Sequence, residues 1–269
     1  MSATHDVTNQ VPPMVGHDPI AGDAALAEAC VRHADEAALA SLAGLGALAG
    51  SEQAQEWGRL ADGNPPTLRT HDRFGHRIDE VEFHPAWHWL MERAVGHGLA
   101  AAPWERQADG DPDAHLRRAA GFMAWSHTEP GHGCPISMTY AAIPALRVDE
   151  ALAKEWTPVL ASTTYDPGLR PVSEKLGALC GMGMTEKQGG SDVRANVTEA
   201  RPAADGTYTL HGHKWFTSAP MNDVFLVLAQ AAGGVACFVV PRVLPDGTRN
   251  RLAVVRLKDK LGNRSNASS

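Results

Sequence analysis

Residues 181–192, GMGMTEKQGGSD, mark the point at which the character of the sequence changes. Before about residue 178 the chain is rich in alanine, and its apolar residues recur at helical spacing. After that point, short β-branched runs alternate with glycine-containing turns. The sequence therefore predicts an α+β protein. Its expected parts are an extended arm at 1–21, an all-helical domain at 22–177 and an antiparallel β-barrel or sandwich domain at 178–269.

Capping residues and helix breakers set the expected limits of the helices. Asp23 and Ser51 are good N-cap residues, and Gly50 and Pro65 are typical of helix ends. Residues 67–83 carry turn signals around an alternating stretch, which predicts a short hairpin or an irregular excursion. The expected helices are 24–33, 35–49, 52–61, 85–95, 113–126, 135–148 and 150–160.

In the β region, runs of β-branched and apolar residues are separated by Asp-Gly and Gly-Gly turns. Short strands at this spacing favour antiparallel pairing in a barrel or sandwich. The expected strands are 178–184, 207–213, 224–230, 235–241 and 252–257.

Composition limits the class of protein. Of the 269 residues, 43% are hydrophobic and 20% are charged, which favours a packed core over general disorder. The net charge of -7 argues against whole-surface attraction to nucleic acid or anionic membranes, although residues 241–269 are locally basic. No apolar stretch reaches the roughly 20 residues needed to span a bilayer. The scattered cysteines and the absence of a leader pattern predict a reduced, cytoplasmic protein without a disulfide framework. No metal is expected, because the spacing of His127, His132 and Cys134 fits no zinc pattern.

The glycine-rich stretch can hold a polar ligand. Gly189 and Gly190 permit positive φ angles and close approach of a ligand to the backbone. Thr185 and Ser191 add hydroxyl groups. Such a loop suits a polar heterocycle or a phosphate, but the sequence is neither a P-loop nor a complete dinucleotide fingerprint. Taken alone, Gly-Gly-Ser-Asp is more often a plain turn.

A second informative stretch is 211–220, HGHKWFTSAP. There a predicted strand ends in Trp215 and Phe216, followed by the hydroxyls of Thr217 and Ser218. An aromatic pair beside hydroxyl donors can stack on a flavin ring and bond its edge. Ordinary core packing at a strand end is the alternative.

The two stretches lie about 30 residues apart and together resemble the flavin-contacting signatures of the acyl-CoA dehydrogenase superfamily. The family's Met/Val-Thr-Glu-Pro-x-x-Gly-Ser-Asp element matches MTEKQGGSD at 184–192, with Lys187 in place of Pro. Its Gly-x-Lys-x-Trp-Ile-Thr-Asn element matches GHKWFTS at 212–218, with Phe216 and Ser218 in place of Ile and Asn. KLGNRS at 260–265 resembles a third element. The stretches NQVPP, FHPAWH and PRVLPDG are similar to the alkylation-response, AidB-like branch.

The resemblance implies that FAD is the cofactor and that both stretches contact it. The methionines and the first threonine would line the pyrimidine side of the flavin, and the aromatic pair would pack on the isoalloxazine. The glycine and serine of the first loop would approach the cofactor or the acyl channel, and the last two hydroxyls would bond the ring edge or phosphate side. The implied cofactor-binding residues are Met182, Met184, Thr185, Gly190, Ser191, Trp215, Phe216, Thr217 and Ser218.

The resemblance also implies an acyl-CoA-like or other small hydrophobic substrate, and a homo-oligomer, which is a tetramer in the full-length family. Family members remove a proton α to a thioester with a glutamate base from a C-terminal helical bundle. That bundle is not part of this sequence, so we nominate no catalytic residue and expect the β domain to be incomplete. Three hypotheses follow: a truncated flavoprotein of the alkylation response, a double-stranded DNA-binding damage-response protein with a structural flavin, or an inactive fragment.

Overall fold

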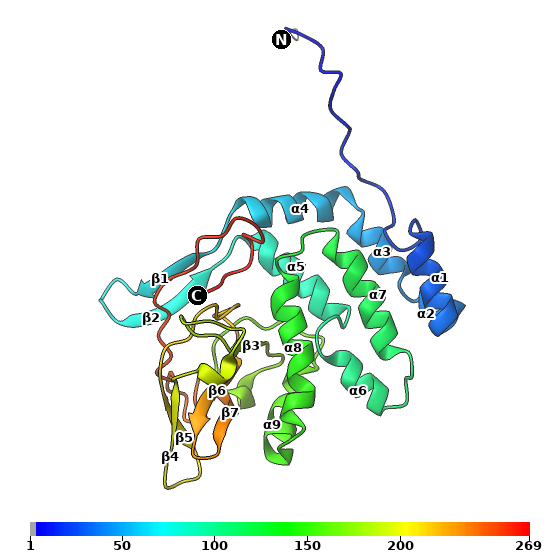
Figure 1. The fold of residues 1–269 in the computed structure, drawn as a ribbon. Helices are drawn as coiled ribbons and strands as arrows, with labels where there is room; N and C mark the ends of the chain where they lie inside the picture. Colours follow the sequence, from blue (N-terminus) through cyan, green and yellow to red (C-terminus); the bar gives the residue numbers. More distant parts are fainter. Residues whose placement is uncertain (1–3) are drawn as a thin grey trace.

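The computed structural model describes residues 4–269 and separates the helices from the main sheet (Figure 1). Helices occupy one side of the molecule, and strands β3–β7 lie beside them. This order confirms the predicted fold class, a helical region followed by a sheet-rich one. The predicted arm runs without helix or strand from residue 4 to residue 18, whereas residues 1–3 lie outside the described part of the chain.

Most predicted helices form close to their expected limits. Asp23 caps the first by accepting from the Leu26 amide, and Ser51 caps the fourth. The predicted helix at 35–49 is in fact two helices, because the Ser41 hydroxyl donates to the Ala38 carbonyl and ends the first of them. The helices are α1 Ala24–His33, α2 Glu36–Ala40, α3 Ala43–Ala49, α4 Glu52–Gly63, α5 Pro85–Gly96, α6 Ala102–Ala108, α7 Ala114–Ser126, α8 Gly133–Leu146 and α9 Glu150–Leu160.

The helical region also contains a β-hairpin, so it is not all-helical. Strands β1 (Thr67–His71) and β2 (Arg77–Glu82) pair antiparallel, which confirms one of the two expectations for this stretch. The hairpin contacts the end of the chain, since the Arg77 guanidinium donates to the Val254 carbonyl at 3.0 Å. This hydrogen bond thus ties the 251–256 segment to the hairpin.

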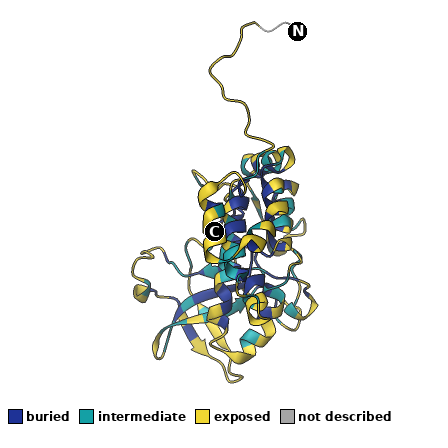
Figure 2. Ribbon diagram, turned by 90° about the vertical axis from the view of Figure 1, so that its right-hand side faces the viewer, coloured by how far each residue is buried: buried dark blue, intermediate teal, exposed yellow. Residues whose placement is uncertain are grey.

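The core of the helical region lies around α5. Trp87, Leu90 and Met91 on this helix are at most 1% exposed, and Trp87 stacks on Phe83 with ring centroids 4.6 Å apart. Buried residues form a band through the centre of the molecule, from the helices into the sheet (Figure 2). The two regions therefore share a continuous interior.

The main sheet is mixed and, among residues 4–269, does not close into a barrel. β6 pairs parallel with β3 and β4 and antiparallel with β7, and β4 and β5 form an antiparallel hairpin. This corrects the expectation of wholly antiparallel pairing. The long excursion between β3 and β6 lets the chain return in the same direction. The strands are β3 Cys180–Gly183, β4 Glu199–Pro202, β5 Tyr208–His211, β6 Val224–Ala231 and β7 Gly234–Pro241, with short 3₁₀ turns η1 Val172–Glu174 and η2 Val193–Ala195.

One strand was not predicted, and one predicted strand did not form. β4 was missed because its sequence, Glu-Ala-Arg-Pro, is charged and carries a proline, which propensity assigns to turns. The predicted strand at 252–257 is extended but has no strand partner among the described residues. Its residues instead line a cavity beside the sheet.

One face of the sheet is covered by helices. Side chains of Cys180 and Met182 on β3, and of Val224 and Leu226 on β6, pack in a cluster with residues of α8 and α9. The Cys180 amide donates to the Thr139 hydroxyl of α8 at 3.0 Å. We call this side the helix-covered face.

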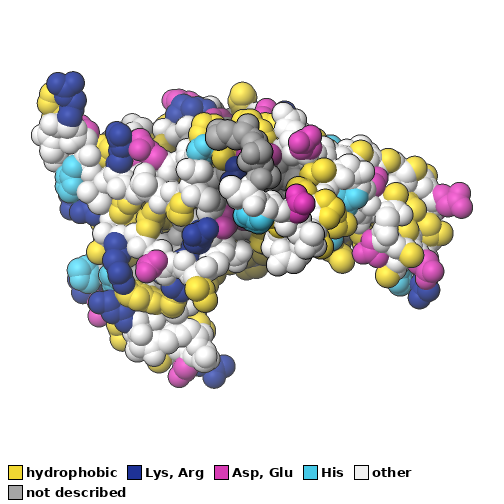
Figure 3. All heavy atoms as spheres, turned by 90° about the horizontal axis from the view of Figure 1, so that it is seen from above, with side chains coloured by type: hydrophobic (Ala, Val, Ile, Leu, Met, Phe, Trp, Pro, Cys, Tyr) yellow, Lys and Arg dark blue, Asp and Glu magenta, His cyan; other side chains and the backbone are white. Residues whose placement is uncertain are grey.

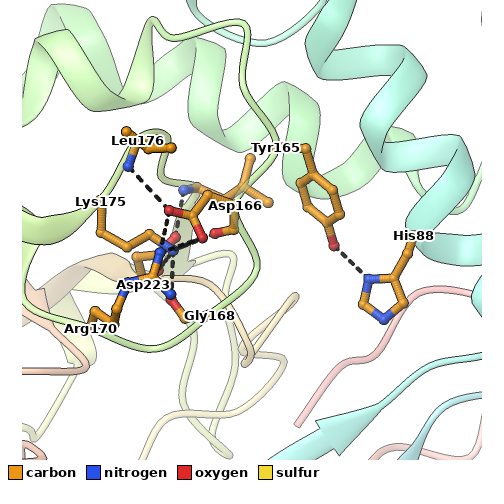
Figure 4. Close-up of polar contacts among 9 residues, drawn as sticks. His88, Tyr165, Asp166, Gly168, Arg170, Lys175, Leu176 and Asp223 are labelled. Atoms are coloured by element: carbon orange, nitrogen blue, oxygen red, sulfur yellow. Dashed lines mark hydrogen bonds and ion pairs between the residues drawn. The ribbon is translucent and has the colours of Figure 1, made fainter.

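The connector between α9 and β3 is held by buried charges (Figure 4). The Lys175 ammonium, 1% exposed, lies 3.0 Å from the Asp223 carboxylate and 3.7 Å from that of Asp166. Nearby, the Tyr165 hydroxyl and the His88 ring nitrogen are 2.9 Å apart, which joins the connector to α5. Burial raises the pKa of Asp223, against the lowering effect of Lys175. Because a buried charge is tolerated only when paired, this network fixes where the sheet begins relative to the helices.

Within residues 4–269, no helix combines the length and the apolar character needed to cross a bilayer.

Candidate functional site

The two predicted stretches meet in space. We call residues 184–192 the glycine loop and residues 212–218 the aromatic loop. The Trp215 amide donates to the Thr185 carbonyl at 2.9 Å, and Met182 pairs with Ser218 in an antiparallel bridge. Residues about 30 positions apart in sequence are therefore direct neighbours at one edge of the sheet.

The aromatic loop is fixed on its other side by the last residues of the chain. Thr217 and Ser269 exchange both backbone hydrogen bonds at 2.9 Å, and Ser218 pairs with Ser268. Within the loop, Phe216 adopts a left-handed backbone conformation with φ 60°. Such a conformation is uncommon for a non-glycine residue and costs about 1 kcal/mol or more. The surrounding hydrogen bonds hold it in place.

A cavity of about 470 Å³ lies against the aromatic loop and against the side of the sheet opposite the helices. Trp215, Phe216 and Thr217 line it, which brings three of the predicted cofactor residues to one surface. We call the sheet residues around it the cavity face, and segment 251–256 covers part of the opening. The cavity face comprises Gly183, Leu210, Phe225, Val227 and Val240.

Positive charge surrounds the aromatic rings. Lys187 and Arg256 lie 6.0 and 5.8 Å from the Trp215 ring centroid, and Lys258 lies 4.0 Å from that of Phe216. No carboxylate in the described part of the chain forms an ion pair with any of these three cations. Lys and Arg side chains gather on the side of the molecule where the hairpin and the sheet lie (Figure 3). The surroundings of the loops are thus suited to an anionic ligand with a flat apolar part.

Two hydroxyl groups near Trp215 are unused. Thr185 and Thr217 are half-buried, and neither side chain makes a hydrogen bond within residues 4–269. By contrast, the Ser218 hydroxyl lies 3.1 Å from that of Ser268. Both threonine hydroxyls are therefore available to a bound molecule, and Thr217 lines the cavity whereas Thr185 does not.

The remaining predicted residues lie elsewhere. Met182 and Met184 pack against the α8–α9 cluster on the helix-covered face, and they do not line the cavity. Gly190 and Ser191 are exposed at the far end of the glycine loop. A Cβ at Gly190 would come within 2.8 Å of the Thr185 hydroxyl oxygen, so the lack of a side chain there leaves that hydroxyl accessible.

Sequence analysis did not assign a role to the charged residues inside the two loops. The Glu186 carboxylate is 2% exposed and lies 2.8 Å from the Lys214 ammonium. A signal was present, because the first motif carries the acid Glu186 and the second carries the base Lys214. Periodicity alone, however, could not show that the two motifs lie side by side.

Residues 4–269 contain no group of three or more His, Cys, Asp and Glu side chains arranged to hold a metal. His132 instead pairs with the buried Glu129 carboxylate at 3.2 Å, between the rings of Trp87 and Trp125.

Comparison with known proteins gives two family matches. Residues 9–167 match the adaptive response protein AidB N-terminal domain, and residues 181–269 match the acyl-CoA dehydrogenase middle domain. The second match begins within β3.

Among curated proteins, AidB of Escherichia coli (strain K12) is 49% identical over 98% of this chain, which covers 49% of that protein. The crystal structure of Caenorhabditis elegans ACDH-11 in complex with C11-CoA superposes with a TM-score of 0.81 at 28% identity, covering 99% of this chain and 47% of that one. A glutaryl-CoA dehydrogenase from Mycobacterium smegmatis in complex with FADH2 shares the fold, with a TM-score of 0.56 at 18% identity over 88% of this chain and 52% of that one.

This chain spans about half the length of these relatives. The two family matches and the E. coli relative are consistent with the observed fold, a helical region followed by a sheet-rich one, and with the placement of the two motif loops side by side. The chain belongs to the acyl-CoA dehydrogenase superfamily, in its AidB-like branch.

Proposed function

We propose that this chain is the FAD-contacting half of an acyl-CoA dehydrogenase-like flavoprotein of the alkylation response. The observation that carries the proposal is the junction of the glycine and aromatic loops, where the Trp215 amide donates to the Thr185 carbonyl and the hydroxyls of Thr185 and Thr217 are both unused. An aromatic residue with two free hydroxyl donors close to it in the chain fold matches a flat heterocycle with hydrogen-bonding groups at its edge.

In this proposal, Trp215 and Phe216 pack on the isoalloxazine, while Thr185 and Thr217 donate to its polar edge. Ser218 completes the edge from beside β3. Gly190 and Ser191 would border the part of the cofactor that leaves the ring. Bound FAD would supply the redox chemistry by accepting a hydride from the substrate, and the protein residues would orient the ring and exclude water from it.

The residues present fit such a group. The lining combines apolar and aromatic side chains with the cations Lys187, Arg256 and Lys258, and it contains no Asp or Glu side chain. A phosphate-bearing cofactor is favoured by positive surroundings. The glycine loop has two acidic residues: the charge of Glu186 is paired with Lys214, and Asp192 is exposed, with its carboxylate accepting from the Arg194 amide.

For the substrate, we propose an acyl-CoA-like thioester or another small hydrophobic molecule. The relative ACDH-11 was crystallised with C11-CoA. Met182 and Met184 stand on the helix-covered face at the level of the loops, and their flexible thioethers suit contact with an acyl chain. We propose that the base which removes the α proton comes from outside these 269 residues.

The test is FAD binding by the 269-residue chain, measured by equilibrium dialysis and by the change in flavin absorbance. Replacing Thr185 and Thr217 together by valine removes two donors of about 1 kcal/mol each, so affinity should fall roughly thirtyfold. Thr209→Val is the matched control, because Thr209 is exposed on β5 outside both loops. It should leave affinity unchanged.

Two results would oppose the proposal. Absence of FAD binding by the unmodified chain would remove it for this chain and favour the inactive fragment. Full affinity in both the double threonine variant and Trp215→Ala would place the flavin elsewhere.

A second candidate is binding of double-stranded DNA, favoured by the cations without carboxylate partners around 251–258. Affinity for a duplex should then fall steeply as salt rises, and Arg256→Gln with Lys258→Gln should reduce the salt dependence. No mobility shift of duplex DNA at low salt would eliminate this candidate.

A further inference from the structure

The Glu186 carboxylate is the point at which three segments of the β region are joined. Its first oxygen lies 2.8 Å from the Lys214 ammonium and accepts from the amide of Thr198 at 3.0 Å and from the hydroxyl of the same residue. Its second oxygen accepts from the Val197 amide and the Gln188 side-chain amide, each at 2.8 Å. One carboxylate thus holds the glycine loop, the aromatic loop and the segment that leads into β4.

These contacts surround the hydrogen bond between the two loops. Glu186 directly follows Thr185, and Lys214 directly precedes Trp215. The ion pair therefore stands one residue away from the bond in which the Trp215 amide donates to the Thr185 carbonyl at 2.9 Å. The third segment is tied to the same place, because the Asn196 side-chain amide donates to the Met184 carbonyl at 3.0 Å.

The site is built for a charged carboxylate. Burial alone would raise the pKa of Glu186, but hydrogen bonds from Lys214, Thr198, Val197 and Gln188 outweigh burial and hold that pKa well below its ordinary value. The Lys214 ammonium is 11% exposed and has no other carboxylate partner among the described residues. Loss of the Glu186 charge would therefore leave an uncompensated cation beside Trp215.

We propose that Glu186 is a positioning residue. Its ion pair with Lys214 holds the Thr185 hydroxyl and the Trp215 ring at the separation that a flavin needs. The same pair neutralises the charge of Lys214 next to Trp215. This inference rests on the proposed function and adds to it a residue that contacts neither substrate nor cofactor.

A purely structural role makes a different prediction. A buried ion pair often contributes little net stability compared with neutral residues of similar size. Replacing both partners, as in Glu186→Gln with Lys214→Met, should then return the chain to near its original melting temperature. If Glu186 positions the loops, that double variant remains folded but does not recover the loop geometry.

The experiment compares Glu186→Gln, the double variant and the control Glu199→Gln, whose carboxylate forms an exposed pair with Arg201 on β4. Hydrogen exchange of the Trp215 amide, followed by NMR, reports the bond between the loops without any flavin. FAD affinity and the flavin midpoint potential report its consequence.

In Glu186→Gln we expect exchange at Trp215 to accelerate, and FAD affinity to fall, by roughly tenfold each. The midpoint potential should shift to more positive values, because the freed Lys214 charge stabilises the reduced, anionic flavin. The double variant should lose that shift while its affinity stays reduced, and Glu199→Gln should change none of these quantities.

Should Glu186→Gln fail to fold, Thr198→Val removes only one donor to the carboxylate, and it should give a smaller acceleration of Trp215 exchange. Unchanged exchange at Trp215 in a folded Glu186 or Thr198 variant would overturn the inference, whatever the chain does with FAD. Accelerated exchange in a chain that never binds FAD would instead support the link between the loops and remove the proposed function.

Discussion

The two faces of the main sheet differ in what covers them. On the helix-covered face, Cys180, Val224 and Leu226 pack against α8 and α9 and are at most 4% exposed. On the cavity face, the same strands present Gly183 and Val227 to an opening of about 470 Å³. Alternate residues of one strand therefore serve different purposes, since the first set holds the chain together and the second leaves space.

The helix-covered face is closely packed, whereas the cavity face has open space beside it. The loops that form the candidate site leave the sheet at the boundary between the two faces. The glycine loop follows β3, whose side chains pack on the helix-covered face. The aromatic loop borders the cavity through Trp215. A perturbation of the first face should act on stability, and one of the second face should act mainly on the loops.

The largest expected difference comes from the same substitution on the two faces. Leu226→Ala removes a buried side chain from the helix-covered face and should lower the free energy of unfolding by about 3 kcal/mol. Leu210→Ala, on the half-buried cavity face, should lower it by about 1 kcal/mol, because the space beside it is already open. Urea denaturation measures both, and equal losses would mean that the cavity face is as closely packed as the other.

A smaller difference in stability is expected between alanine substitutions at the two glycines of β3. A Cβ at Gly181 would come within 2.4 Å of the Phe225 ring, whereas one at Gly183 would meet Lys214 and Val227 at 3.4 and 3.5 Å. Gly181→Ala should therefore cost about 2 kcal/mol through overpacking, and Gly183→Ala less than about 1 kcal/mol. Thermal melting of both variants tests this prediction. A larger loss of stability in Gly183→Ala than in Gly181→Ala would mean that the open space lies beside Gly181 and not beside Gly183.

The smallest effect is the response of the loop junction to acid. Because the pKa of Glu186 is lower in the folded chain than its ordinary value of 4.5, its contribution to stability is complete above that value and declines as the pH falls below it. The stability difference between the native chain and Glu186→Gln should be constant from about pH 7 to 5 and shrink by about 1 kcal/mol by about pH 3.5. A difference that grew on acidification would contradict the assigned direction.

Sequence reasoning recovered what depends on local pattern. Caps at Asp23 and Ser51 and the breaks around Gly50 defined helices within a few residues of their observed limits. Pairing was harder to predict, because the parallel alignment of β3 with β6 depends on a long excursion whose path no local pattern records. The missed strand β4 depends on its partner β5, not on its own propensity.

The candidate site was predicted through motif resemblance, and the structure adds the arrangement. Thr185 and Trp215 are adjacent, as a shared ligand would require, but Met182 and Met184 turn to the opposite face because side chains alternate along β3. The Glu186–Lys214 ion pair could be recognised only from the structure, which shows that the two motifs are in contact.

The left-handed backbone at Phe216 has a consequence for engineering this loop. Phe216 is 44% exposed, and its backbone conformation sets the direction of its ring. The Lys258 ammonium lies 4.0 Å from the centroid of that ring. Glycine at this position would relax the backbone but remove the surface on which that cation rests. Ease of folding and the aromatic surface are therefore opposed at a single residue, and a design that improves one will reduce the other.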